Sequence, residues 1–197
     1  YLPSYSVIVG GYYNQAASEN SFVGSGYFNK ALGMRSAIVG GEQNQALAWH
    51  GFVGCGDENV VYTNYSAIVG GYQNISSNNY TFVGGGTYNY ALGAYSAVLG
   101  GRGNTAEGNY SVAGGYQAAA THVGEFAHSS GDFSDRGDAQ GSEYILRRTT
   151  TGASTYQLYL NGGDAAPLTL ASNRVVAFEA LIVAAADNGD AAVYKYS

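Results

Sequence analysis

The sequence predicts an all-β protein that begins with a parallel β-solenoid of 15-residue coils and continues into a small antiparallel β-sheet or sandwich. Asparagine returns every 15 residues, at Asn14, Asn29, Asn44, Asn59, Asn74, Asn89 and Asn104. Serine or threonine returns at the same spacing, at Ser6, Ser21, Ser36, Ser66, Thr81, Ser96 and Ser111, and Gly51 fills the one gap. Because a fixed period indicates stacked repeat units, we expect a solenoid domain over residues 1–115.

A second period of 30 residues lies within the first. Segments that read SVIVGG, SAIVGG, SAIVGG and SAVLGG alternate with SFVGSG, GFVGCG and TFVGGG. Strand side chains alternate between two faces, so the side chains of each segment divide into two sets. One set is β-branched in every coil. The other set contains Ala and Val in one coil and Phe and Gly in the next. Protein interiors pack near crystal density, so we infer that neighbouring coils stack directly and exchange volume between layers.

The recurring Asn and Gly residues predict the corners of each coil. Asparagine tolerates the left-handed backbone region in tight turns, and amides stacked about 4.8 Å apart can form a ladder of hydrogen bonds. The paired glycines, such as Gly40 and Gly41, supply the other corner. A small residue, Ala in most coils, lies two positions after each Asn. This spacing predicts a second short strand packed close to the first.

The composition favours assembly. Charged residues make up 11% of the 197 residues, about half the usual share. No apolar run reaches the roughly 18 residues of a membrane helix, and a net charge of −6 argues against nucleic-acid binding. A thin rod leaves apolar surface uncovered, including a column of tyrosines at Tyr5, Tyr65, Tyr80, Tyr95 and Tyr110. We therefore expect a parallel homotrimer, with a broader monomeric solenoid as the alternative.

The pattern SAIVGG–x–x–N–x–A, over roughly residues 5–120, resembles the head repeats of trimeric bacterial autotransporter adhesins. That resemblance implies a left-handed parallel β-roll. Similar coils also occur in phage fibres, so the resemblance is more specific for fold than for function.

The period breaks after Gly115. Residues 116–143 predict an irregular neck, and residues 144–197 predict an antiparallel β domain. Its expected strands are Tyr144–Thr149, Thr155–Asn161, Pro167–Leu170, Arg174–Ala185 and Ala191–Ser197, with a hairpin turn at 187–190. The strings GDAQGSEYILRRTTTGAS and LTLASNRVVAFEALIVA resemble a module of tailed-phage structural proteins. That resemblance implies a phage tail fibre or tailspike in the virion, whose partners are sister chains, other tail proteins and a host surface glycan or protein.

The candidate glycan contacts are tyrosines near the Gly corner, because tyrosine is favoured at recognition surfaces: Tyr12, Tyr13, Tyr27, Tyr72 and Tyr88. Packing along the rod or against a sister chain is the alternative for these rings. Glu42 and Asp57 interrupt the same column, which weakens the idea of a continuous sugar groove.

The sequence does not favour an enzyme, and we expect no cofactor or metal. His122, His128, Asp132 and Asp135 have suitable ligand chemistry, but a loop fixes no geometry. Ser129 and Ser130 near His128 lack the elbow that a nucleophile needs. Arg136–Gly137–Asp138 is interpreted as a coincidence within the phage-type module. None of the sequons at Asn64, Asn74, Asn79 and Asn109 is interpreted as functional, since three of them are by-products of a coil boundary. A bacterial adhesin head is the alternative function, and a polysaccharide depolymerase is a third.

Overall fold

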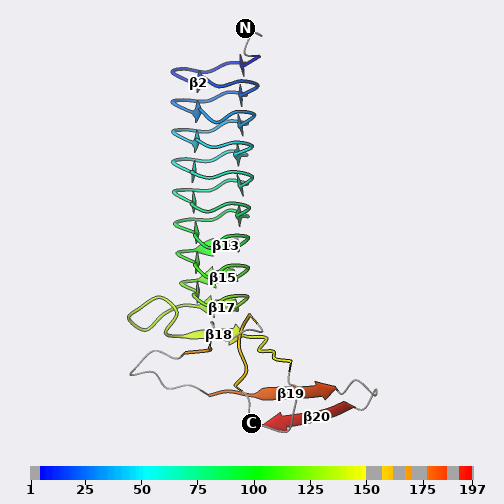
Figure 1. Cartoon of the computed structure of the whole chain (residues 1–197). Helices are drawn as coiled ribbons and strands as arrows, with labels where there is room; N and C mark the ends of the chain where they lie inside the picture. Colours follow the sequence, from blue (N-terminus) through cyan, green and yellow to red (C-terminus); the bar gives the residue numbers. More distant parts are fainter. Residues whose placement is uncertain (1–4, 150–156, 162–166, 170–176, 186–190, 197) are drawn as a thin grey trace.

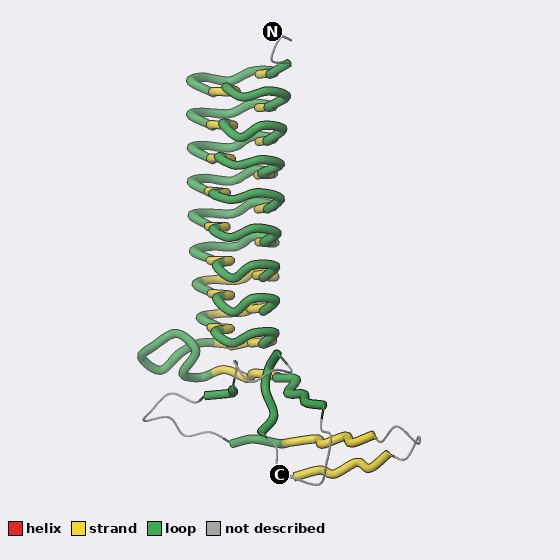
Figure 2. Tube along the Cα trace, viewed as in Figure 1, coloured by secondary structure: helices red, strands yellow, loops and turns green. Residues whose placement is uncertain are grey.

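The computed structural model describes residues 5–149, 157–161, 167–169, 177–185 and 191–196, and these residues contain strands, turns and loops but no helix. Figure 1 shows a rod of stacked coils that starts near the N-terminus and ends at β18. Figure 2 shows that the short strands of the rod fall into columns joined by loops. The predicted parallel β-solenoid is confirmed.

The rod contains two sheets, which we call sheet A and sheet B. Sheet A consists of β1 (Val7–Ile8), β3 (Phe22–Val23), β5 (Ala37–Ile38), β7 (Phe52–Val53), β9 (Ala67–Ile68), β11 (Phe82–Val83), β13 (Ala97–Arg102), β15 (Val112–Tyr116), β17 (Phe126–Ser130) and β18 (Gln140–Glu143). Sheet B consists of β2 (Gln15–Ala16), β4 (Lys30–Ala31), β6 (Gln45–Ala46), β8 (Val60–Val61), β10 (Ile75–Ser76), β12 (Tyr90–Ala91), β14 (Thr105–Ala106) and β16 (Ala119–Ala120). Strands of neighbouring coils pair in parallel, 15 residues apart over most of the rod, so that Phe22 lies opposite Ala37.

The interior of the rod is narrow. From the second to the seventh coil, sheet A contributes one fully buried β-branched residue per coil, at Val23, Ile38, Val53, Ile68, Val83 and Val98. Sheet B contributes a mostly small buried residue, at Ala31, Ala46, Val61, Ser76, Ala91 and Ala106. Small side chains let the two sheets approach closely, which confirms the predicted second strand. Ile8 in the first coil stays 46% exposed because no described coil covers it.

The predicted asparagine ladder forms inside the rod. The side-chain carbonyl of Asn44 accepts the backbone N–H and the side-chain N–H of Asn59, at 3.1 and 3.0 Å. The amide nitrogen of Asn44 donates to the carbonyls of Gly40 and Gly56, at 3.1 and 2.7 Å. This arrangement recurs along the column, so each asparagine joins its own coil to both neighbours.

The expectation that asparagine itself takes the left-handed conformation is wrong. The residue before it does so, with φ of 52° at Gln43 and 55° at Glu58. The second glycine of each pair is also left-handed, as at Gly41 with φ of 96°, and so is the residue before each serine, as at Tyr65 with φ of 57°. The buried hydrogen bonds of the asparagine side chain hold that residue in place, so its neighbour makes the turn.

The side chains that alternate in size lie on the outer face of sheet A. Phe52 is 38% exposed and Val39 is 51% exposed. Direct stacking is confirmed, because Phe52 lies opposite both Ala37 and Ala67. We inferred that large and small side chains alternate between coils in the interior. That location is wrong, because these side chains alternate on the outer surface of sheet A. Each phenylalanine ring lies close to the glycine two residues further along, where a Cβ on Gly54 would be 3.6 Å from Phe52.

The solenoid continues past residue 115, so the irregular neck predicted for residues 116–143 is wrong where β16, β17 and β18 lie, whereas residues 131–139 contain no strand, as predicted. The strands β15, β16 and β17 extend both sheets, but paired residues are now 14 apart. The register shifts between Val98 and Gly101, where the next coil loses one residue. The last coil also lacks the markers of the repeat, because Ala118 replaces asparagine and Glu125 replaces serine. The pattern in the sequence therefore ends before the fold does.

Beyond the last coil the strands become antiparallel. β18 pairs with β17, and β19 (Ala180–Ala185) pairs with β20 (Ala191–Tyr196). The predicted strand from Arg174 is shorter than expected, since residues 177–179 are not in a strand. The strands predicted at 144–149 and 167–170 are absent among the residues described there. One isolated antiparallel bridge joins Arg147 to Tyr159, which lies in the strand predicted at 155–161. The predicted turn at 187–190 lies outside the described residues.

Candidate functional site

The five tyrosines predicted as glycan contacts lie at the corner that follows sheet A. They are Tyr12, Tyr13, Tyr27, Tyr72 and Tyr88. The exposed fractions of Tyr12 and Tyr13 are 76% and 72%. Their rings pack on aromatic neighbours: Tyr13 stacks on Phe28 with ring centroids 5.0 Å apart, and Tyr72 meets Tyr88 edge-on at 5.5 Å.

Carboxylates separate these tyrosines into two groups. One column of β-bridges runs from Tyr27 through Glu42 and Asp57 to Tyr72, with each residue paired to the next, and Glu58 follows Asp57 in the chain. Burial raises the pKa of Asp57, and the negative charges of Glu42 and Glu58 raise it further. The predicted interruption is confirmed, so this corner presents two aromatic groups with an acidic group between them.

The opposite corner carries a continuous aromatic stack. His50, Tyr65, Tyr80, Tyr95 and Tyr110 follow one another in successive coils, with ring centroids 4.9, 5.2, 4.7 and 5.2 Å apart. The angles between neighbouring ring planes are 12°, 5°, 3° and 10°. The exposed fraction of the four tyrosines lies between 47% and 62%. Each ring therefore covers the face of the next and turns its edge to solvent.

A second ladder of asparagines lies beside this stack. The side-chain carbonyl of Asn64 accepts the backbone N–H of Trp49 at 3.0 Å, and that of Asn79 accepts the N–H of Asn64 at 3.1 Å. Asn109 binds the N–H of Ala94 in the same way at 3.0 Å. This ladder was not predicted from the sequence, because its three asparagines were interpreted only as sequons. Their spacings of 15 and 30 residues are the signal that could have revealed it. Asn74, in the fourth sequon, belongs to the buried ladder.

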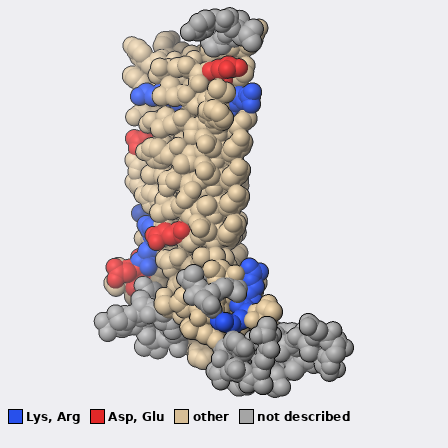
Figure 3. All heavy atoms as spheres, viewed as in Figure 1, with Lys and Arg blue, Asp and Glu red and all other residues tan. Residues whose placement is uncertain are grey.

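The outer face of sheet A is apolar and uncharged from β1 to β15. Its side chains are Val7, Val9, Phe22, Gly24, Ala37, Val39, Phe52, Gly54, Ala67, Val69, Phe82, Gly84, Ala97, Leu99, Val112 and Gly114. Near the base the face is hollowed, and the hollow is lined by Leu99, Gly114, Phe126 and His128 among others. In the space-filling view of Figure 3, charged side chains lie toward the two ends of the rod and at its left edge, and a wide stretch of the visible surface between them carries none.

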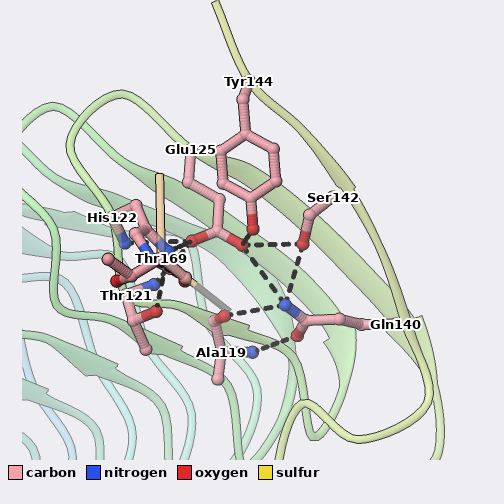
Figure 4. Close-up of polar contacts among 8 residues, drawn as sticks. All are labelled: Ala119, Thr121, His122, Glu125, Gln140, Ser142, Tyr144 and Thr169. Carbon is pink, nitrogen blue, oxygen red and sulfur yellow. Dashed lines mark hydrogen bonds and ion pairs between the residues drawn. The ribbon is translucent and has the colours of Figure 1, made fainter. Parts of the chain in front are cut away.

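Glu125, at the base of the rod, is a buried carboxylate with an exposed fraction of 1%. Its Oε2 accepts the backbone N–H groups of Thr121 and His122, at 2.8 and 3.0 Å, and lies 3.2 Å from Nδ1 of His122. Its Oε1 accepts the hydroxyls of Ser142 and Tyr144, at 2.7 and 2.9 Å. Figure 4 shows these groups converging on the carboxylate from the last coil, from β18, which contains Ser142, and from Tyr144 directly after β18.

Burial opposes the ionisation of Glu125, but the hydrogen bonds from Ser142, His122 and Tyr144 outweigh it and lower the pKa of the carboxyl. The ionised carboxylate therefore ties the last coil to the chain that follows. His122 adds a second link, because its Nε2 lies 3.0 Å from the carbonyl oxygen of Thr169. This network joins the rod to its C-terminal segment and offers no open site for a substrate.

Gln140 closes the edge of sheet B. Its side-chain carbonyl accepts the N–H of Ala119 at 2.7 Å, and its amide nitrogen donates to the carbonyl of Ala119 at 2.9 Å. A peptide group of another strand would make the same two bonds. Gln140 therefore covers the edge of sheet B against pairing with another chain, while in sheet A the parallel stacking ends at β18, which pairs antiparallel with β17.

Of the residues considered for metal binding or nucleophilic chemistry, His122 and Ser129 have other partners. No group of three or more His, Cys, Asp or Glu side chains in the described part of the chain could hold a metal, so His122, His128, Asp132 and Asp135 are not brought together as a site. The hydroxyl of Ser129 donates to the carbonyl of Ala139 at 3.0 Å, which leaves it poorly placed as a nucleophile.

The Arg136–Gly137–Asp138 tripeptide is bound into the base of the rod. The guanidinium of Arg136 donates to the side chains of Gln117 and Thr105 and lies 5.5 Å from the ring centroid of Tyr90. The carboxylate of Asp138 accepts three backbone N–H groups of residues 133–135, which lower its pKa to about 2. Both charged groups of the tripeptide therefore serve the local structure.

Among the described residues no helix is long and apolar enough to cross a membrane. No protein-family model matches the sequence, and no curated protein matches it either. The surfaces of the rod are therefore the basis on which its function is inferred.

Proposed function

We propose that this chain is a shaft segment of a bacteriophage tail fibre or tailspike, assembled as a parallel homotrimer and able to adhere to the host surface. The observation that carries the proposal is the uncharged apolar outer face of sheet A, which runs along the rod from β1 to β15. Faces of this extent mark sites of protein association. Three copies arranged around one axis cover that face in each chain, and their symmetry closes the assembly.

The shape of the rod suits a spacer. Each coil is bonded to both neighbours through two sheets and the asparagine ladder, so the structure resists bending without a wide core. The outer face of sheet A alternates between coils with Phe beside Gly and coils with Ala beside Val, which gives projections and recesses in a two-coil period. Sister chains with the same pattern can interlock in a fixed register. The remaining sides stay available to host glycans or proteins, and the ends to other virion proteins.

The head fragment of a bacterial trimeric autotransporter adhesin is the alternative, because it would use the same rod and the same apolar face. Location separates the two functions. An antibody raised against this chain, with gold-labelled detection in electron microscopy, should decorate the tails of phage particles from the source of the sequence. Label on bacterial cell surfaces and not on particles would instead support the adhesin, and label on neither would contradict both.

A polysaccharide depolymerase is the third function. The clustered carboxylates Glu42, Asp57 and Glu58 lie at a corner between aromatic groups, and Asp57 has a raised pKa. A glycosidase requires a carboxylic acid with a raised pKa on one side of the bound sugar and a second carboxylate on the other side. We expect no release of reducing ends from capsular polysaccharide incubated with the chain. Release that disappears in a Glu42→Gln, Asp57→Asn variant would replace the adhesive function by an enzymatic one.

A further inference from the structure

We propose that the corner between sheet B and sheet A binds a neutral, linear polysaccharide that lies along the rod axis. This inference rests on the adhesive role in the proposed function and gives that role a site. We call the site the tyrosine strip, and it consists of Tyr65, Tyr80, Tyr95 and Tyr110 with Asn64, Asn79 and Asn109 beside them. It differs from the corner of Tyr12 and Tyr13, which the sequence had suggested.

Neither the backbone nor the core requires tyrosine in this column. The four tyrosines have φ between 57° and 62°, a left-handed conformation that is strained for an aromatic residue. Asn20 and Gly124 occupy the same column in other coils with φ of 55° and 68°, and both residue types adopt this conformation more easily. About half of each tyrosine side chain is exposed, so the rings add little to the interior. Their role therefore lies at the surface.

The strip presents hydrogen-bonding groups. The faces of the rings are covered by their neighbours, so ring edges point to solvent. Within the described residues, the tyrosine hydroxyls have no hydrogen-bond partner. The carbonyl groups of Asn64, Asn79 and Asn109 are used by the backbone, and their amide nitrogens have no partner in the described part of the chain. Hydroxyls thus repeat at the strand spacing of about 4.8 Å, and amides accompany them in every coil except that of Ala94.

The charge of the strip selects the class of ligand. The two columns that form it, over residues 49–50, 64–65, 79–80, 94–95 and 109–110, contain no Asp, Glu, Lys or Arg. Nucleic acids and other polyanions need clustered positive charge, which is absent here. A polymer that repeats uncharged hydroxyl groups along its length matches a row of uncharged donors and acceptors. A neutral polysaccharide has this chemistry.

The test compares substitutions that the backbone tolerates. The whole chain is measured against immobilised dextran, mannan and galactan, with alginate as an acidic probe. Wild type should bind at least one neutral polymer and bind alginate more weakly. Tyr80→Asn with Tyr95→Asn should weaken binding at least about tenfold, because contacts to two adjacent coils are lost. Asn20 shows that asparagine is accepted in this conformation. Tyr80→Phe with Tyr95→Phe keeps the stacked rings and removes only the hydroxyls, so it should weaken binding to a similar extent.

The matched control is Tyr13→Asn, at a residue with φ of 55° on the opposite corner, and it should leave binding unchanged. Wild type that binds none of the neutral polymers would overturn the inference, as would an Asn double variant that binds like wild type or an equal loss in Tyr13→Asn. The molecular mass of the same samples separates the two proposals. A trimer that does not bind polysaccharide rejects only the strip, whereas a monomer that binds it rejects the trimeric shaft.

Discussion

Replacing Asn59 by alanine should destabilise the rod strongly, because the side chain makes five hydrogen bonds inside it. Its carbonyl accepts the backbone and side-chain N–H groups of Asn74, at 3.1 and 3.0 Å. Its amide nitrogen donates to the carbonyls of Gly71 at 2.8 Å and Cys55 at 3.3 Å, and to the side-chain carbonyl of Asn44 at 3.0 Å. Alanine retains none of these bonds.

The cost follows from which groups lose their last partner. The backbone N–H of Asn74 is left unpaired in the interior, which costs about 1–3 kcal/mol. The carbonyl of Gly71 keeps a bond from the N–H of Asp57 at 2.9 Å, so it loses only part of its bonding. Each group that loses one hydrogen bond and keeps another contributes at most about 1 kcal/mol to the loss. We therefore expect the free energy of unfolding to fall by roughly 3–5 kcal/mol.

Urea unfolding followed by circular dichroism measures this change. The control is Asn64→Ala, which removes one bond of the same kind at the surface, where water can replace it. That variant should lose less than about 1 kcal/mol. Equal losses in Asn59→Ala and Asn64→Ala would refute the conclusion that the buried ladder holds the coils together.

Three further predictions concern the corners and the base. Gly41→Ala should unfold the rod at much lower urea concentration than Gly40→Ala, because its Cβ would lie 2.1 Å from the carbonyl of Gly56 at a φ of 96°, whereas a Cβ at Gly40 makes ordinary contacts. Equal midpoints would contradict this. The lowered pKa of Glu125 means that its carboxylate stabilises the base above the unfolded pKa near 4.5 and that this stabilisation is lost as the pH falls through the folded value. Protection against hydrogen exchange at residues 119–144, corrected for the intrinsic exchange rate at each pH, should therefore fall in acid in the wild type and show no such fall in Glu125→Gln. Gln140→Ala should expose the edge of sheet B and raise turbidity on concentration; an unchanged solution would show that the cap is dispensable.

The sequence was sufficient for the repeat and insufficient for its surfaces. The spacing of Asn29 and Asn44 determined the ladder, because only an in-register stack brings such residues together. Alternation along a strand separates two faces but does not say which is inside, and both sets in sheet A are apolar. The ring of Phe52 was therefore placed in the interior although it lies outside.

The base of the rod was out of reach for a different reason. One lost residue between two coils changed the spacing from 15 to 14, and Glu125 took the place of serine. The donors that stabilise Glu125 come from residues 121–144, and no local pattern connects them. The stacked tyrosines, by contrast, were visible in the spacing of Tyr65 and Tyr80, but their left-handed backbone and exposed edges required coordinates.

Sedimentation equilibrium tests most directly whether sister chains cover the outer face of sheet A. The wild-type chain should sediment at three times the 20.5 kDa of a single chain. Phe52→Glu, which places a charge in the middle of that face, should sediment as one chain, while Gln45→Glu on sheet B should remain a trimer. A wild-type mass of 20.5 kDa, or a Phe52→Glu variant that stays trimeric, would contradict the account.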